Sequence, residues 1–234
     1  MKKTAILALL AGFAPMASHA ADIVGANVGA SHFNYLDADS RDQSRTNIGG
    51  QMEVGFTPQF SLQGDMALNR YWDDSWDGHT TALHAIYNMN GMMKFGARAG
   101  FERIDGDDYT TLGVEYKGDY GMFSVESAYN HVKSDDADMQ GNLYNVSATM
   151  PLNSQVKVGG RLDYYDTDDV TGRRYAATGE YDLGNGYAMT GELGFNDANH
   201  DDAESYVGIG LRADLGQGGV SFSDHSLSDL IVGH

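Results

Sequence analysis

The stretch from Met92 to Glu102, Met-Met-Lys-Phe-Gly-Ala-Arg-Ala-Gly-Phe-Glu, alternates between apolar and polar residues. Every second position from Met93 to Phe101 is apolar, and Lys94 and Arg98 stand among the positions between them. Successive side chains of a β-strand point to opposite faces of its sheet. The stretch therefore predicts a strand with one apolar face and one charged face.

The same alternation recurs along most of the chain and predicts about twelve strands between residues 21 and 215. Longer acidic stretches, such as Asp37 to Ser44 and Trp72 to Gly78, follow the odd-numbered strands. Short turns, such as Thr57 to Gln59, follow the even-numbered strands. At Asn90-Gly91 we expect a two-residue primed hairpin turn, because Asn-Gly is the preferred pair for that turn.

The polar face of the expected strands is rich in ions. Its charged residues are Lys94, Arg98, Glu102, Glu115, Glu126, Lys157, Arg161, Asp163, Arg174, Glu180, Glu192 and Arg212. A dry core that held so many ions would be very unfavourable, whereas a water-filled lumen would keep them hydrated. Aromatic residues such as Phe60, Tyr87 and Tyr187 lie near strand ends on the apolar face, as in the aromatic girdle of a membrane barrel.

These patterns predict an all-β fold, a closed antiparallel up-and-down transmembrane β-barrel of about twelve strands. A soluble lipocalin-like or sandwich protein would alternate equally well, but the charged face and the aromatic girdle favour the membrane barrel. Long loops at one rim and short turns at the other are also typical of such barrels. No boundary divides residues 21–215, so we expect one domain.

The N-terminal residues have the order of a secretory signal. Lys2 and Lys3 precede an apolar run from Ile6 to Phe13, and Ala17 to Ala20 form a cleavage site with small residues. The apolar run is too short to span a membrane. We therefore expect residues 1–20 to be removed as a signal peptide, and the chain to be exported.

Residues 216–234 follow the last expected strand and form a C-terminal tail of unknown role. Two further short strands, Val220 to Ser223 and Leu230 to Gly233, would raise the strand count to fourteen. A plug inside the lumen and a periplasmic extension are the other arrangements. We favour the extension.

The signal peptide, the strand count and the loop asymmetry together resemble a Gram-negative outer-membrane β-barrel of the porin-like type. The resemblance is architectural and covers residues 21 to about 215, without a motif that identifies a subfamily. It implies location in the outer membrane beside lipid and lipopolysaccharide, insertion by the outer-membrane assembly machinery, and passive diffusion of small hydrophilic solutes. Such barrels usually end on a strand with a terminal aromatic residue, whereas this chain ends Ile231-Val232-Gly233-His234.

Composition excludes several classes of function. The net charge of -18 repels nucleic acid, so no nucleic-acid partner is expected. The absence of cysteine removes disulfides, thiolate metal sites and cysteine nucleophiles. The mean hydropathy of -0.40 does not argue against a membrane barrel, because only half of each strand is apolar.

The charged lumen points to the function. Lys94 and Arg98 lie four residues apart on one inner face, as do Lys157 and Arg161. Facing rows of basic and acidic groups would create a transverse field that selects small polar or charged solutes. The predicted pore-lining residues are Lys94, Arg98, Glu102, Glu126, Lys157, Arg161, Asp163 and Arg174. The alternative is an internal salt-bridge network that closes a narrow barrel.

Other chemistry has weaker support. Asp105 to Asp108 resembles the start of a calcium loop, but Thr110 stands where a glycine is required, so we expect neither a metal nor a cofactor. A lipase- or protease-type barrel enzyme is an alternative. His131, Ser134 and Asn130 are close in sequence, but they do not form a triad, because adjacent residues of a strand point to opposite faces. We expect that the chain is not an enzyme. A structural or binding barrel that uses its acidic loops also stays open, as does assembly into a homo-oligomer.

Overall fold

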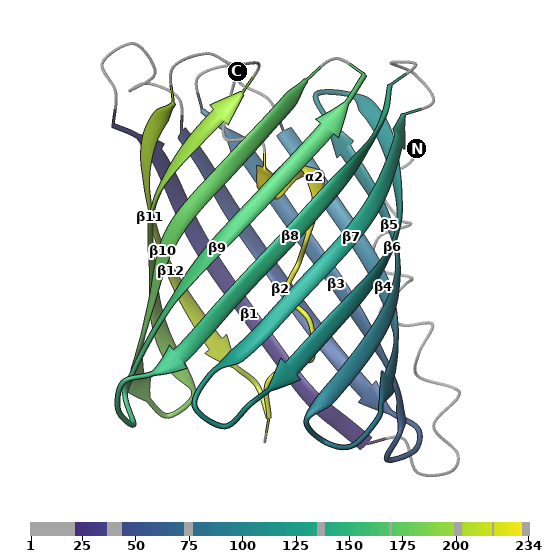
Figure 1. Cartoon of the computed structure of the whole chain (residues 1–234), viewed down its shortest axis with the longest axis vertical. Coiled ribbons are helices and arrows are strands. Elements are labelled where there is room, and N and C mark those ends of the chain that lie inside the picture. Colours follow the sequence, from purple (N-terminus) through teal and green to yellow (C-terminus); the bar gives the residue numbers. More distant parts are fainter. Residues whose placement is uncertain are drawn as a thin grey trace, which may run out of the picture.

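The computed structural model describes residues 22–36, 44–72, 77–134, 139–168, 170–198, 203–216 and 218–230. Within these ranges, twelve antiparallel strands form one closed barrel (Figure 1). The strands are β1 (Asp22–Tyr35), β2 (Ser44–Gly55), β3 (Phe60–Tyr71), β4 (Asp77–Asn88), β5 (Met93–Ile104), β6 (Asp107–Asp119), β7 (Ser124–Ser134), β8 (Gln140–Pro151), β9 (Val156–Thr167), β10 (Thr171–Gly184), β11 (Tyr187–Ala198) and β12 (Glu204–Asp214). The predicted up-and-down barrel of twelve strands is thus confirmed.

Each strand pairs with its neighbours in the chain, and β1 pairs with β12 to close the sheet. The closing register runs from Asn27 opposite Asp214 to Tyr35 opposite Tyr206. Closure pairs the backbone N–H and C=O groups of the first and last strands, which would otherwise form exposed edges. A closed sheet is therefore suited to cross a lipid bilayer.

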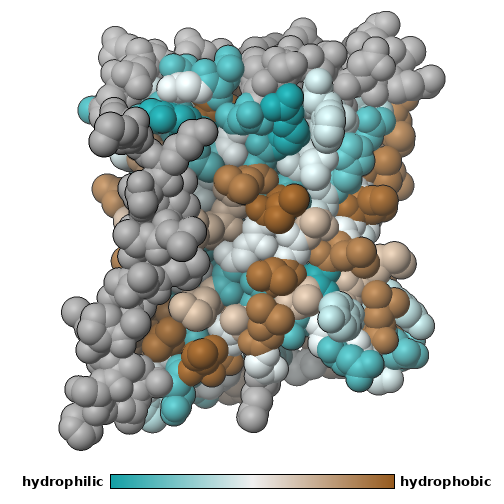
Figure 2. Space-filling model, turned by 180° about the vertical axis from the view of Figure 1, so that it is seen from behind, coloured by the Kyte–Doolittle hydropathy of each residue, from teal (hydrophilic) through white to brown (hydrophobic). Residues whose placement is uncertain are grey.

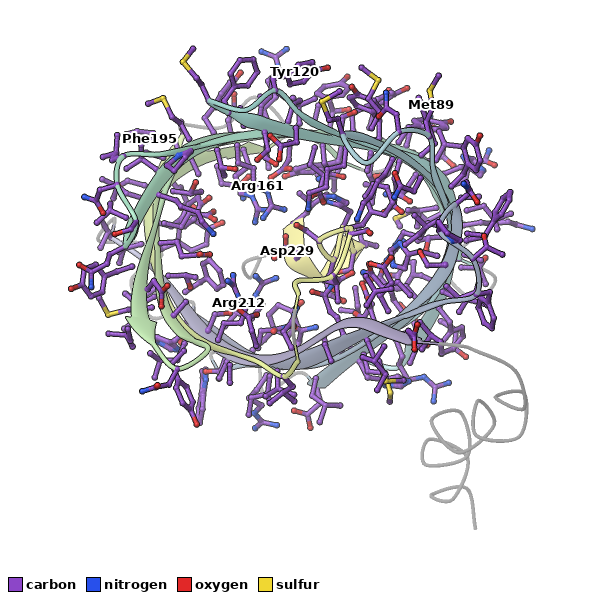
Figure 3. All side chains as sticks on the ribbon, turned by 90° about the horizontal axis from the view of Figure 1, so that it is seen from below. Met89, Tyr120, Arg161, Phe195, Arg212 and Asp229 are labelled. Carbon is purple, nitrogen blue, oxygen red and sulfur yellow. The ribbon has the colours of Figure 1, made fainter. Side chains whose placement is uncertain are left out.

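The two faces of the sheet follow the predicted parity. Apolar side chains cover the outer face, where Leu112 and Ile209 are each 65% exposed. Figure 2 shows apolar residues across the middle and lower part of the outside, and hydrophilic residues towards the upper rim and at the lower right. In the view along the barrel, Met89, Tyr120 and Phe195 point away from the interior (Figure 3). An outer surface of this kind is suited to lipid.

Aromatic side chains pair across neighbouring strands on the outer face. The ring centroids of Phe60 and Tyr87 are 5.2 Å apart, and those of Tyr129 and Tyr144 are 5.1 Å apart. Offset aromatic pairs at such distances are favourable beyond the area they bury. They form part of the predicted aromatic girdle.

The turns differ from the prediction at two places. Residues 89–92 join β4 to β5, and only Gly91 among them has a positive φ, of 77°, so the primed two-residue turn predicted at Asn90-Gly91 is wrong. The Asn90 side chain accepts a hydrogen bond from the Met93 N–H at 2.8 Å and thereby supports the longer turn. Primed geometry instead occurs at Asp105-Gly106 and Asn185-Gly186, where both residues of each pair have positive φ.

The two rims of the barrel differ less than the sequence predicts. The connections after odd-numbered strands, at the loop rim, range from two residues (105–106) to eight (36–43), and those after even-numbered strands, at the turn rim, have two to four (Figure 1). The expected acidic loop at Asp105 to Asp108 is a two-residue turn, because β6 begins at Asp107. Residues 37–43 and 73–76 of the other acidic loops lie outside the described residues, as does the expected signal peptide. No helix within the described ranges has the length and apolar character needed to span a membrane.

The C-terminal tail corrects a further prediction. After Asp214 the chain enters the lumen at the turn rim. It runs through the interior to a short helix, α2 (Leu227–Leu230), near the loop rim (Figure 1). The expected periplasmic extension is therefore wrong for residues 218–230, and the alternative strand at Val220 to Ser223 does not form either. The physical reason is that Phe222 and the leucines of α2 pack against inward-facing side chains of the wall. Burial of these apolar side chains stabilises the segment inside the lumen.

Val114 tests the assignment of the outer face to lipid. It lies on β6 and is 59% exposed. We expect Val114→Arg to lower the free energy of unfolding by about 2 to 4 kcal/mol, because a charge near mid-strand would face hydrocarbon. Equilibrium urea unfolding in lipid vesicles measures the change.

Thr178→Arg is the matched control, since Thr178 faces the interior from β10. Its expected cost is below about 1 kcal/mol, because water can hydrate an added charge there. Equal costs for the two variants would contradict the outward placement of Val114 in lipid.

Candidate functional site: the lumen and the segment inside it

The lumen contains a part of the chain itself. Residues 218–230, here called the C-terminal segment, run through the interior between the two rims (Figures 1 and 3). Most of their described side chains are buried, and α2 is their only regular element. The candidate site is therefore the inner wall together with this segment.

Polar side chains of the wall bind the backbone of the segment. The Ser221 N–H donates to Glu53 Oε2 at 2.7 Å, and the Ser223 N–H donates to Glu126 Oε1 at 2.6 Å. Between them, Gln63 accepts from the Phe222 N–H at 3.0 Å and donates to the Phe222 carbonyl at 2.7 Å. These contacts satisfy backbone groups that have no strand partner.

Phe222 packs on a buried histidine. Its ring is fully buried and stacks on His84, with centroids 6.3 Å apart and planes 12° apart. His84 Nε2 lies 3.1 Å from Asp65 Oδ2, and His84 Nδ1 lies 2.7 Å from Glu115 Oε2. The two carboxylates fix the ring plane on which Phe222 rests.

Three arginines surround one carboxylate near the loop rim. Asp229 lies 3.0 Å from Arg45 and 3.2 Å from Arg174, and it also pairs with Arg161. We call Arg45, Arg161 and Arg174 the arginine clamp. Asp163 joins the clamp from the wall, at 2.8 Å from Arg161 and 2.7 Å from Arg174. Buried guanidinium groups need such partners, because an unpaired buried charge is costly.

Glu102 holds the start of α2. It is fully buried and accepts hydrogen bonds from the Leu227 N–H at 2.9 Å and from the Ser228 N–H at 2.8 Å. A carboxylate at the first turn of a helix satisfies N–H groups that lack intrahelical partners. Leu227 and Leu230 pack into an apolar cluster with Tyr71, Ile104, Val132, Leu143, Tyr165 and Ala198.

The segment fills only part of the lumen. An open cavity of about 370 Å³ remains beside it. In the view along the barrel, Arg161 and Arg212 point into the interior, on the side that the segment leaves free (Figure 3). The polar lining of the cavity consists of Ser31, Ser124, Ser147, Thr149, Thr178, Thr190 and Ser223, together with Lys117, Glu126, Lys157, Glu180 and Glu192.

Most charges around the open cavity are paired, and Glu192 accepts a hydrogen bond from the Tyr206 hydroxyl. Glu180 lies 2.8 Å from Lys157 and 2.7 Å from Arg212. Lys117 lies 3.2 Å from Glu126. The cavity is thus lined by hydroxyl groups and by neighbouring charges of opposite sign, which suits small polar molecules.

The eight predicted pore-lining residues all lie on inward-facing positions, but in two different surroundings. Glu126 and Lys157 line the open cavity. Lys94 donates to Ser221 Oγ at 2.7 Å, and Arg98 donates to Asp224 at 3.3 Å. The remaining four also contact the segment or its partners, and they are Glu102, Arg161, Asp163 and Arg174. Mixed pairs therefore replace the expected facing rows of one sign.

Sequence reasoning missed the residues that receive the segment. Arg45 and His84 are among them, as are the inward apolar residues such as Ile104, Val132 and Leu143. The sequence contained a clue to them. These three apolar residues occupy inward-facing positions near strand ends, where a water-filled lumen should have polar side chains. An apolar patch on that face indicates that something covers it.

The residues considered for a barrel enzyme and for a calcium loop do not come together as a site. Ser134 and Asn130 point inward and are buried, whereas His131 points outward and is exposed. Asp108, from the calcium-like stretch, pairs with Arg103 at 2.5 Å. Across the described ranges, no group of three or more His, Asp and Glu residues is arranged to hold a metal ion.

Solved structures of similar shape are outer-membrane proteins. The KdgM porin in complex with disordered oligogalacturonate has a TM-score of 0.64 and 11% identity, over 80% of this chain and 98% of that one. The NanC porin has a TM-score of 0.60 and 10% identity, over 81% and 100%. An outer membrane channel from Pseudomonas putida F1 has a TM-score of 0.58 and 12% identity, over 82% and 96%. At these identities the likeness establishes the fold alone.

Sequence comparison supplies the family. No curated protein matches the chain. A family model described as Gram-negative porin matches residues 59–202, which is more than half of the 234 residues. Members of this family are channels rather than enzymes. The chain belongs to the Gram-negative porin family and is an outer-membrane channel for passive diffusion of small hydrophilic solutes.

Proposed function

We propose that solutes cross the barrel beside the C-terminal segment, through the open cavity along the inner faces of β6 to β12 and β1. The observation that carries this proposal is the cavity of about 370 Å³, which lies within the lumen and has a polar lining. The other side of the lumen is occupied by the segment and its buried contacts. A cavity of this volume favours small solutes over large ones.

The lining suits hydrophilic solutes of mixed chemistry. Serine and threonine hydroxyls can replace part of a solute's hydration shell, since each can donate and accept. Pairs such as Lys157 with Glu180 put opposite charges side by side and add a local field across the path. We infer that uncharged and dipolar solutes pass most readily.

The eight predicted residues then have two roles in this proposal. Glu126 and Lys157 line the open cavity and act on solutes directly. Lys94, Arg98, Glu102, Arg161 and Arg174 hold the segment and so set the width of the path, and Asp163 supports two of them by pairing with Arg161 and Arg174. Pore-lining in the strict sense thus applies to Glu126 and Lys157.

We further propose that export and assembly follow the usual route of such barrels. Residues 1–20 would direct export, and the outer-membrane assembly machinery would insert the barrel. The outward placement of His131, away from Ser134, supports a channel without a catalytic role. Lipid and lipopolysaccharide would contact the apolar outer face.

Single-channel current tests the proposed path. Residues 21–234, refolded and inserted in a planar bilayer, should give discrete conductance steps. Silence from protein whose barrel is shown to be folded would contradict the proposal. Binding at the acidic loops would then be the leading alternative.

Thr178→Trp tests the position of the path. The added ring would enter the open cavity, so we expect the conductance to fall by roughly half or more, because a constriction limits ion flow. Ala177→Trp is the matched control, since Ala177 is the next residue on β10 and is exposed on the outer face. A similar fall for both variants, or for neither, would place the path elsewhere.

Lys157→Gln and Glu180→Gln test the charged lining. Loss of the lysine should raise the ratio of potassium to chloride permeability by about twofold or more, because a cation is removed from the path. Loss of Glu180 should lower the same ratio, since it leaves Lys157 and Arg212 without this partner. Reversal potentials in a salt gradient give the ratio.

Arg103→Gln serves as the control, because Arg103 is exposed on the outer face of β5 and pairs with Asp108. Its permeability ratio should match that of the unchanged protein. Shifts of the same sign for Lys157→Gln and Glu180→Gln would refute the assigned lining.

A further inference from the structure

The inner wall contacts the C-terminal segment in the way that a binding site contacts an extended peptide. No strand of the barrel continues into the segment, and wall side chains bind its backbone at several successive residues. Glu53, Gln63, Glu126 and Glu102 receive its N–H groups at distances of 2.6 to 3.0 Å. Recognition of backbone groups by side chains is a mode that an extended peptide can satisfy.

Three subsites also distinguish the side chains of the segment. The first is the face of His84, which stacks on Phe222. The second is the apolar cluster near the loop rim, which takes Leu227 and Leu230. The third is the arginine clamp, which takes the carboxylate of Asp229. Together the three subsites bind an aromatic residue and, further along the chain, a Leu-x-Asp-Leu sequence. The site is therefore selective for the sequence of the peptide that it binds.

A glycine-rich stretch, here called the tether, joins the bound part of the segment to the barrel and includes the first two residues of the segment. Gly216, Gly218 and Gly219 follow β12, and Gly216 has a φ of 135°, which favours glycine. The tether passes so close to Gly25 that a Cβ there would lie 2.5 Å from the Gly218 carbonyl oxygen. A short covalent link gives its ligand an effective concentration on the order of millimolar, so binding and release are both intramolecular.

The polar part of the contact is incompletely satisfied. Within the described ranges, buried atoms without a hydrogen-bond partner include Arg45 Nε, Arg98 Nε, Asn130 Oδ1 and His225 Nδ1. Each belongs to the segment or to a side chain that touches it. Departure of the segment would let water hydrate these atoms, and their hydration offsets part of the free energy needed to break the segment's hydrogen bonds to the wall.

We propose that the inner wall is a peptide-binding site, that the C-terminal segment is its tethered ligand, and that the segment leaves the wall reversibly and widens the lumen. The ligand class is an extended peptide that carries an aromatic residue and a Leu-x-Asp-Leu end. The proposal rests on the proposed function only for its electrical readout. Binding itself is measured without current.

The chain offers a direct test because it contains no cysteine. Thr80 Oγ1 on β4 lies 3.3 Å from Ser228 Oγ, and both residues are buried. Thr80→Cys with Ser228→Cys should form a disulfide that locks the segment to the wall. The reduced protein should show a base conductance level and wider openings, and the oxidised protein should show the base level alone.

Each single cysteine variant is the control and should respond to neither oxidant nor reductant. Identical conductance levels in the oxidised and reduced pair, with the disulfide verified by mass spectrometry, would overturn the proposal. Absence of all current would contradict the proposed function instead. In that case the exchange measurement below decides the present proposal.

Asp229→Asn and Glu102→Gln should release the segment without a cysteine. The first removes the charge that the arginine clamp holds, and the second replaces a buried acceptor of two N–H groups. We expect about tenfold or more faster hydrogen exchange at the Leu227 and Ser228 amides, since buried charged hydrogen bonds contribute at least that factor. Asp77→Asn is the matched control, because Asp77 on β4 also pairs with an arginine, Arg70 at 2.6 Å, but that pair is exposed at the surface.

A free peptide of residues 221–230 completes the test. Added at millimolar concentration to Asp229→Asn protein, it should slow the exchange of protected wall amides and suppress the wider openings. The same peptide with asparagine in place of Asp229 should be weaker. Unchanged exchange in both release variants, or equal effects of the peptide and a scrambled version, would overturn the proposal.

Discussion

The structure depends on the requirement that every backbone N–H and C=O group in a bilayer be paired within the protein. Twelve strands meet this requirement only because β12 returns to pair with β1. Closure then fixes the parity of every strand, since each side chain must face either lipid or lumen. The apolar outer face and the charged inner face are consequences of that one constraint.

A barrel of twelve strands encloses more space than its own side chains fill, and less than a wide pore. Here the chain fills part of that space with its C-terminal segment. The segment supplies carboxylates to wall arginines and receives wall carboxylates on its backbone N–H groups. Much of the charge in the lumen is therefore paired locally, and the remaining cavity is bordered by close pairs such as Lys157 with Glu180.

The strands and their faces were predictable because a period of two is a local property of the sequence. The turn at Asn90-Gly91 was not, because side-chain hydrogen bonds such as that from Met93 to Asn90 select a longer turn over the statistically preferred one. The place of the C-terminal segment was not predictable by periodicity either. Its partners, such as Ile104 and Leu143, come from separate strands, and only the folded barrel brings them together.

The arginine clamp couples the width of the lumen to its charge. With the segment in place, three guanidinium groups share two carboxylates, those of Asp163 and Asp229. Without the segment they would share one, so a wider lumen would also be a more positive one. Because the Arg161 side chain is 18% exposed and points into the interior (Figure 3), solutes in the lumen would experience this change. Size selection and charge selection are therefore two effects of the same contact in this channel.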